Sequence, residues 1–162
     1  MNADSEHIQL RPTISDDLPL FYHFQTEHDT HQSSADHNKN FTTEEDYIKN
    51  YLKLLEDPTV NSQTIIIGQT IVGTVAKFLR EDKPEVTYLI DRKHCNKGIA
   101  TRVLQQFLSI ITERPLYGRV ATDNIPSQCV LKKCGFQQIE TACYYSKSRQ
   151  AETDEIIYCI NG

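Results

Sequence analysis

Hydrophobic and polar positions follow two different periods along the chain, and these periods predict where helices and strands lie. Apolar residues recur every three or four positions over 18–25 and 47–55, as on the buried face of a helix. From 64 to 90 the pattern changes to β-branched runs separated by short polar turns, which is typical of adjacent strands. Helical spacing returns after Gly98 and again over 126–133. The chain is therefore predicted to mix helices and strands throughout.

Turn and capping residues set the limits of these elements. Ser15 is expected to cap the first helix, and Thr42 with Glu45 forms a capping box for the second. In order, we expect a strand at 7–11, helices from 15 and from 42, strands at 64–67, 70–79 and 85–90, a helix from 98 to 114, a strand at 116–121, a helix at 126–133, and strands at 136–146 and 155–160. This order predicts an α+β (mixed α/β) fold whose largely antiparallel sheet contains one parallel crossover.

Length and charge limit the classes of protein to which the chain can belong. Its 162 residues fit a single domain spanning 1–162. The formal net charge of −5 and the isoelectric point near 5.6 are opposite to those of a typical nucleic-acid binder, so no nucleic-acid partner is expected. No apolar run approaches the ~18–20 residues that cross a bilayer, so no membrane partner is expected.

The five cysteines predict the compartment. Their number is odd, none form a CxxC pair, and the polar segment 1–7 does not resemble a secretory signal. We interpret them as reduced thiols in a cytoplasmic protein. The sequence leaves a monomer and a homodimer equally open.

The segment CNKGIAT, from Cys95 to Thr101, is the sharpest local signal for chemistry. It joins a predicted strand to a predicted helix, so several N–H groups at the start of the helix have no partner within it. Gly98 allows close approach of a ligand, and Lys97 and Arg102 add positive charge. The segment is therefore a candidate phosphate cradle that differs from the GxGxxG and GxxxxGK[ST] loops. A plain solvated turn is the alternative.

A second segment, NIPSQCVLKKCGF, begins at Asn124 and follows the next predicted strand. Asn124 and Ser127 lie at the start of its helix, where an amide and a hydroxyl can reach a ligand between the two helices. Simple capping of the helix is the alternative for both. Gly135 at the other end is suited to a left-handed cap.

Together these segments resemble the GNAT family of acyl-CoA-dependent N-acetyltransferases. Gly98, Ile99 and Ala100 match the second half of the family's [R/Q]-x-x-G-x-[G/A] loop. The family motif N-x-x-[A/S]-x-x-[L/V]-x-x-x-x-G-F is matched in register by Asn124, Ser127, Val130, Gly135 and Phe136. The resemblance extends over nearly the whole chain, and SQCVLKKCGF is similar to the branch that includes the RimJ and RimL ribosomal-protein N-acetyltransferases.

The resemblance implies a GNAT-like sheet of six or seven strands with about four helices, acetyl-CoA as co-substrate, an amine acceptor and no metal. Acetyl transfer would proceed by direct attack of a primary amine, from a small molecule or a protein N-terminus, on the thioester. The residues that would bind CoA or polarise its thioester carbonyl are Leu89, Ile90, Asp91, Cys95, Asn96, Lys97, Gly98, Ile99, Ala100, Thr101, Asn124 and Ser127.

Two catalytic residues follow from the same resemblance. Glu85, at the start of its strand, is the candidate base that removes the proton of the ammonium group, directly or through water. Leu131 stands where many family members have the tyrosine that protonates the departing thiolate, so Ser127 or a water takes that role here. Cys95 and Asn96 also depart from the family loop, although both keep their backbone N–H groups.

The polar segment 27–40 offers two further interpretations. Its histidines, His28, His31 and His37, lie among aspartates, but a metal site is not favoured in a loop without a frame. Its carboxylates, Glu27, Asp29 and Asp36, are candidates to meet a cationic acceptor.

Two other functions compete with acetyl transfer. The altered loop and the missing tyrosine leave open a catalytically silent acyl-CoA-binding module of the same fold. An unrelated α/β protein with a fortuitous loop is a third possibility, and it would not bind CoA.

Overall fold

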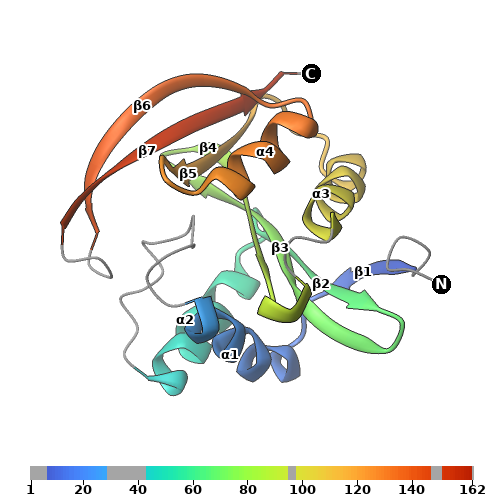
Figure 1. Cartoon of the computed structure of the whole chain (residues 1–162). Helices are drawn as coiled ribbons and strands as arrows, with labels where there is room; N and C mark the ends of the chain where they lie inside the picture. The colour runs from blue at the N-terminus through green and yellow to red at the C-terminus, as the bar shows by residue number, and fades with distance from the viewer. Residues whose placement is uncertain (1–6, 29–42, 95–97, 147–150, 162) are drawn as a thin grey trace.

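A seven-stranded sheet forms the centre of the molecule, with helices on both of its faces (Figure 1). The computed structural model describes residues 7–28, 43–94, 98–146 and 151–161. The strands are β1 (Ile8–Pro12), β2 (Asn61–Ile67), β3 (Thr70–Arg80), β4 (Lys83–Ile90), β5 (Leu116–Ala121), β6 (Gln137–Ser146) and β7 (Ala151–Ile160). The helices are α1 (Leu18–His28), α2 (Glu44–Glu56), α3 (Ile99–Ile110) and α4 (Ile125–Lys133), with short 3-10 turns η2 (Ser15–Asp17) and η4 (Arg92–His94).

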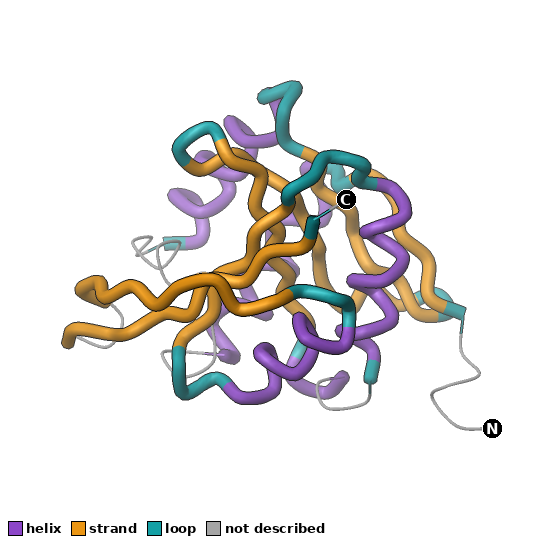
Figure 2. Tube along the Cα trace, turned by 90° about the horizontal axis from the view of Figure 1, so that it is seen from above, coloured by secondary structure: helices purple, strands orange, loops and turns teal. Residues whose placement is uncertain are grey.

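The strand order confirms the predicted fold class. The order is β1-β2-β3-β4-β5-β7-β6, and every neighbouring pair is antiparallel except β4 and β5. The connection from β4 to β5 runs through α3, which is the single parallel crossover expected from the sequence. Figures 1 and 2 both show β6 and β7 extending together beyond the rest of the sheet.

Two expected helix starts are wrong, for local reasons. Ser15 makes no capping hydrogen bond: the first turn is a short 3-10 turn, and the carboxylate of Asp17 accepts the N–H of Ile14 at 3.0 Å. Thr43 caps α2, because its hydroxyl accepts the N–H of Asp46 at 3.1 Å. The expected cap Thr42 lies outside the described residues.

Each face of the sheet has its own apolar core. Helices α3 and α4 cover one face, where Val103, Phe107 and Leu131 pack with strand residues such as Val86 and Ile90. Helices α1 and α2 cover the other, where a cluster formed by Leu18, Phe21, Phe24 and Tyr47 receives Ile71 and Leu89. Because side chains alternate along a strand, β4 contributes to both cores.

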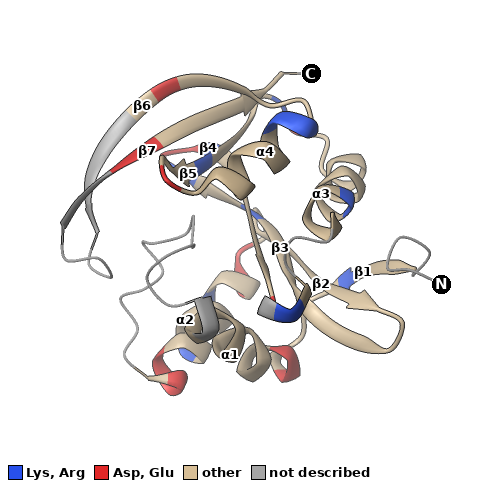
Figure 3. Cartoon of the chain, in the orientation of Figure 1, with Lys and Arg blue, Asp and Glu red and all other residues tan. Residues whose placement is uncertain are grey.

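Charged residues sit favourably at several helix ends (Figure 3). The first turn of α2 carries Glu44, Glu45 and Asp46, and the last turn of α4 carries Lys132 and Lys133. These positions complement the helix dipoles and stabilise each helix by a few tenths of a kcal/mol per charge, up to about 1 kcal/mol. Within the described part of the chain, no helix is both long and apolar enough to cross a bilayer.

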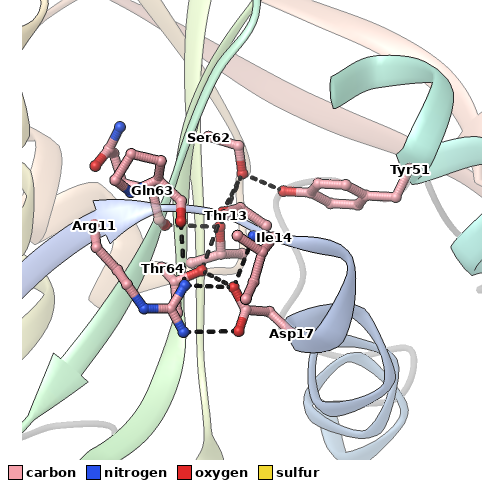
Figure 4. Close-up of polar contacts among 10 residues, drawn as sticks. Arg11, Thr13, Ile14, Asp17, Tyr51, Ser62, Gln63 and Thr64 are labelled. Carbon is pink, nitrogen blue, oxygen red and sulfur yellow. Dashed lines mark hydrogen bonds and ion pairs between the residues drawn. The ribbon is translucent and has the colours of Figure 1, made fainter. Parts of the chain in front are cut away.

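A buried polar cluster fastens the α1–α2 layer to the sheet (Figure 4). The guanidinium of Arg11 donates to both carboxylate oxygens of Asp17, each at 2.8 Å, and the Thr64 hydroxyl donates to the same carboxylate at 2.7 Å. Tyr51 of α2 joins the cluster through the Ser62 hydroxyl at 2.7 Å. Asp17 is only 2% exposed, whereas the Arg11 side chain is 30% exposed, so the carboxylate is shielded from water and the guanidinium only in part.

The pKa of Asp17 reflects this arrangement. Burial raises it, but the hydrogen bonds from Arg11, the Ile14 N–H and Thr64, with the positive charge of Arg11, outweigh that effect and hold the pKa below its usual range. The carboxylate is therefore stabilised in its ionised form, as one half of a structural ion pair.

Candidate functional site

Strands β4 and β5 pair at a single position, and the candidate site is built where they part. Glu85 and Tyr117 are the only residues of the two described strands in register as a parallel pair. Beyond them β4 continues to Ile90 and β5 to Ala121. Because β4 and β5 do not pair beyond this position, there is room between them. Each strand is held on its other side by its second neighbour, β3 for β4 and β7 for β5.

A narrow pocket occupies this gap and is closed from one side by α4. It is lined by Val86, Thr87 and Tyr88 of β4, by Gly118, Arg119 and Val120 of β5, and by Ser127 and Leu131 of α4. Gly118 lets the helix approach closely, since a Cβ at that position would lie 3.2 Å from a Leu131 methyl carbon. Leu131, which occupies the family's tyrosine position, is thus an apolar wall of the pocket.

Two hydroxyl groups meet inside the pocket. The phenol of Tyr88 donates a hydrogen bond to Ser127 Oγ at 2.9 Å, which connects β4 to the first turn of α4. Both side chains are half-buried. The sequence indicates Ser127 as a site residue. The structure adds Tyr88, which the sequence indicates only as part of a strand.

The start of α4 is fixed by buried amides. Asn124 is 5% exposed, and its side-chain oxygen accepts the N–H of Ser127 at 3.3 Å. Gln128 donates to the carbonyls of Ala121 and Thr122 at 3.3 and 2.8 Å, which ties the helix to the end of β5. Asn124 therefore caps the helix and orients Ser127, whatever contact it makes with a ligand.

The start of α3 has the geometry of an anion cradle. Gly98 is the N-cap of the helix with φ 73°, in the left-handed region, and a Cβ built there would meet nothing within 4 Å. The first intrahelical bond runs from the N–H of Arg102 to the Gly98 carbonyl, at 3.3 Å. The N–H groups of Ile99, Ala100 and Thr101 precede that bond and have no acceptor within the helix. The side chain of Ile99 is buried in the core, so only its backbone can face a ligand.

The three residues expected near the thioester carbonyl, at the end of β4 and directly after it, have different roles. The N–H of Asp91 donates to the carbonyl of Val72 on β3 at 2.7 Å. Alternation along the strand therefore directs the N–H of Ile90 away from β3, toward β5. Leu89 packs with the α1–α2 core, and the Asp91 carboxylate accepts the N–H of His94 at 3.0 Å and so shapes η4.

Glu85 lies in an ion-pair network at the point where β4 and β5 pair. It is 4% exposed, and its Oε2 is 2.9 Å from Arg119 Nε and 3.1 Å from Arg80 Nε. Arg119 also lies 3.8 Å from a carboxylate oxygen of Glu155 on β7. Burial lowers the pKa of Arg119, but the hydrogen bond and the negative charge of Glu85 raise it overall, so the guanidinium is held charged.

Several candidates lie outside what the structure describes. These are Cys95, Asn96 and Lys97 of the loop, together with Asp29, His31, Asp36 and His37; the side chains of Glu27 and His28 are not described either. Among the residues described, no group of three or more His, Cys, Asp or Glu is arranged to hold a metal ion.

Comparisons with known proteins agree with this architecture. The family model described as "Acetyltransferase (GNAT) domain" matches residues 7–137. Among solved structures, the ribosomal-protein-S5-alanine acetyltransferase from Vibrio fischeri has a TM-score of 0.76 at 21% identity, covering 96% of this chain and 93% of its own. The microcin C7 self-immunity acetyltransferase MccE, in complex with acetyl-CoA and AMP, has a TM-score of 0.75 at 14% identity over 98% and 93% of the two chains.

A third similar structure comes from the branch that the sequence motifs resemble. RimL, the ribosomal L7/L12 α-N-protein acetyltransferase in complex with coenzyme A, has a TM-score of 0.69 at 14% identity, covering 94% of each chain. No curated protein has a sequence that matches this chain significantly. The match over residues 7–137, which is most of the sequence, places this chain in the acetyltransferase (GNAT) domain family.

Proposed function

We propose that the protein transfers an acetyl group from acetyl-CoA to a primary amine by direct attack in a ternary complex. The observation that carries this proposal is the gap between β4 and β5 with Ser127 in its lining, and the N–H groups at the start of α3 add a candidate site for the diphosphate. The thioester is proposed to lie at this gap. An amine can then approach from the α1–α2 side while CoA lies on the α3–α4 side.

The start of α3 is suited to hold the CoA diphosphate. Ile99, Ala100 and Thr101 offer backbone N–H groups at the positive end of the helix dipole, and the space beside Gly98 is open. The loop residues Cys95, Asn96 and Lys97 would extend this cradle. A backbone N–H within 89–91 is proposed to polarise the thioester carbonyl, because a donor aimed at the developing oxyanion lowers the barrier.

The proton steps are assigned to Glu85 and Ser127. An ammonium group with a pKa near ~10 must lose a proton before it can attack. Glu85 is the proposed base, directly or through water, and Ser127 is the proposed hydrogen-bond donor to the departing sulfur. The ion pairs of Glu85 with Arg80 and Arg119 also give it a structural role, which any test of catalysis must separate.

The acceptor is a small-molecule amine or a protein N-terminus. Solved structures of similar fold include a spermidine N-acetyltransferase (TM-score 0.74, 15% identity) as well as the two ribosomal-protein enzymes. Three described cysteines, Cys129, Cys134 and Cys159, are free, which supports the proposed cytoplasmic location. A silent acyl-CoA-binding module remains the second candidate, favoured by the apolar Leu131 at the family's tyrosine position.

Two measurements test the proposal. A ligand that binds only the native state at a hundredfold excess over its Kd stabilises it by about 2.7 kcal/mol, so acetyl-CoA should raise the melting temperature clearly. Release of free thiol from acetyl-CoA with a panel of amines, including polyamines and short peptides with free N-termini, then separates enzyme from silent module. A melt unchanged by millimolar acetyl-CoA would contradict both candidates.

A further inference from the structure

We propose that Tyr88 is a positioning residue that turns the hydroxyl proton of Ser127 toward the sulfur of CoA. This inference rests on the proposed function, since it concerns the step in which CoA leaves. It assigns a role to a side chain of β4 where the family resemblance points to a residue of α4. The physical basis is the contact between two hydroxyl groups at the wall of the pocket between β4 and β5.

The contact joins parts of the chain that are distant in sequence. Tyr88 Oη donates to Ser127 Oγ at 2.9 Å, a good distance for an O–H···O bond. Both residues line the pocket, and the tyrosine ring also packs against the apolar core beneath α3 and α4. The ring is thus held by packing, and its hydroxyl group meets Ser127 at a defined place.

The direction of this bond determines what Ser127 can do. A serine hydroxyl has one proton to donate and two lone pairs that accept. When Ser127 accepts from Tyr88, its own proton remains for a different acceptor, and donation from Tyr88 polarises that O–H further. Among the described residues Tyr88 is the one hydrogen-bond partner that the Ser127 hydroxyl has. The proton can therefore be directed at a ligand atom in the pocket.

The other walls of the pocket make this hydroxyl pair more important. Leu131 is apolar and packs closely over Gly118, so no donor comes from the position where the family has its tyrosine. The charged group among the lining residues is Arg119, whose guanidinium is engaged with Glu85. Thr87 supplies the remaining hydroxyl of the lining, from the opposite face of β4.

The chemical step balances without any further reactant. The amine nitrogen bonds to the thioester carbon, the C–S bond breaks, and its electron pair stays on sulfur. The amine gives up one proton to the base or to water, and the thiolate finally takes up one proton. Ser127, held by Tyr88, donates a hydrogen bond to the sulfur while its negative charge develops, so the leaving group is stabilised during bond breaking.

The test measures the thiol pKa of bound CoA, which needs no acceptor amine. The chemical shift of the CoA methylene next to sulfur is followed by NMR against pH in the wild type, Tyr88→Phe, Ser127→Ala and the double variant. Tyr117→Phe is the matched control, because it removes a phenol hydroxyl from the neighbouring strand. We expect the wild type to lower the thiol pKa below that of free CoA, and Tyr88→Phe to raise it again by about half a unit to one unit.

Two comparisons within this set distinguish positioning from packing. If Tyr88 acts through Ser127, the double variant should match Ser127→Ala alone, both in thiol pKa and in kcat. Tyr88→Phe should lower kcat about tenfold with little change in the KM for acetyl-CoA. A Tyr88→Phe protein that behaves like Tyr117→Phe, or an effect of Tyr88→Phe that persists in the Ser127→Ala background, would overturn the inference.

The same experiment separates this inference from the proposed function. Thiol pKa shifts as expected, together with failure to acetylate any amine, would refute the enzyme assignment and leave the Tyr88–Ser127 relation intact. CoA signals that stay identical to those of free CoA at every protein concentration would refute both. Melting temperatures of all variants check that the fold is retained.

Discussion

Two groups of buried or half-buried polar side chains differ in what surrounds them. In the cluster of Figure 4, the Asp17 carboxylate receives Arg11, Thr64 and the Ile14 N–H, all from within the protein. At the gap between β4 and β5, Tyr88 donates to Ser127, and both residues line a pocket. The first group lies beside strands that pair antiparallel along most of their length, and the second lies where β4 and β5 pair at one position only.

This difference separates stability from function. A polar group whose partners are all in the protein contributes to the folded state, and removing one partner leaves the others buried and unpaired. A polar group that faces a pocket has donor capacity left for a ligand. Substitutions in the Asp17 cluster should therefore change stability, and substitutions at Tyr88 and Ser127 should change chemistry.

Glu85 provides the strongest test of this comparison, because it has features of both the structural group and the ligand-facing group. It is buried and paired with Arg80 and Arg119, yet it stands beside the gap. If it is the base, Glu85→Gln should lower kcat by roughly 10²–10⁴ and leave acetyl-CoA affinity nearly unchanged. The loss should diminish as the pH approaches the pKa of the acceptor amine, where the amine is already neutral.

Glu155→Gln is the matched control for this variant, since Glu155 also faces Arg119, at 3.8 Å. A base at Glu85 predicts that only Glu85→Gln loses activity. Equal losses of melting temperature and activity in both variants would assign Glu85 to the structural group. Near wild-type kcat in Glu85→Gln at pH 7 would remove it from the mechanism.

The second prediction concerns the closed cluster. Asp17→Asn breaks a partly buried ion pair and leaves the Arg11 guanidinium without its carboxylate, so the free energy of unfolding should fall by up to about 3 kcal/mol. Asp16→Asn is the control, because Asp16 is exposed in the same turn, and it should change stability by less than about 0.5 kcal/mol. Urea unfolding of both variants measures the difference.

The pKa shift of Asp17 predicts how its contribution to stability changes with pH. The folded-state pKa of Asp17 lies below its usual value, so its stabilising contribution is complete above the unfolded-state pKa of about 3.9. Below that pH the contribution declines, and it is lost as the pH falls through the folded-state pKa. The stability advantage of the wild type over Asp17→Asn should therefore be constant near neutral pH and shrink in acid.

The sequence was sufficient for the order of elements because each has a local signal. The left-handed glycine at the end of α4, Gly135 with φ 97°, is one example, and Gly98 at the start of α3, with φ 73°, is another. The cap expected at Ser15 is wrong because the Asp17 carboxylate accepts the N–H of Ile14 in a short 3-10 turn. For α2 the pattern does not separate two adjacent threonines, and the structure has Thr43 as the cap. The Asp17 carboxylate also accepts from Thr64 of β2, 47 positions later, and no local pattern encodes that contact.

The candidate site was predictable only where a motif is contiguous. Gly98 and Ser127 follow from short motifs, but Tyr88 becomes relevant only when β4 and α4 face the same gap. An alternating strand such as KPEVTYLI shows which residues share a face and does not show which one meets a helix almost 40 positions later. Arg80 and Arg119 were missed for the same reason, since their partner Glu85 lies on a different strand.

The smallest expected effect, at Gly98, sharpens the comparison between ligand-facing and structural positions. Gly98 has φ 73° and open space where a side chain would go, and so has Gly68 in the turn between β2 and β3, with φ 63°. An alanine at either position adopts a strained left-handed conformation, so each variant should lose about 1 kcal/mol of stability. Only at Gly98 would the added methyl group occupy space that the CoA diphosphate needs.

Gly98→Ala should therefore weaken acetyl-CoA binding about tenfold, which corresponds to about 1.4 kcal/mol, and Gly68→Ala should leave it unchanged. Isothermal titration of acetyl-CoA into both variants measures the affinity, and thermal unfolding without ligand measures the shared strain. If the two alanines lower stability equally and neither changes the affinity for acetyl-CoA, Gly98 is required only for its left-handed backbone conformation. The diphosphate would then have to be held elsewhere than at the N–H groups of Ile99, Ala100 and Thr101.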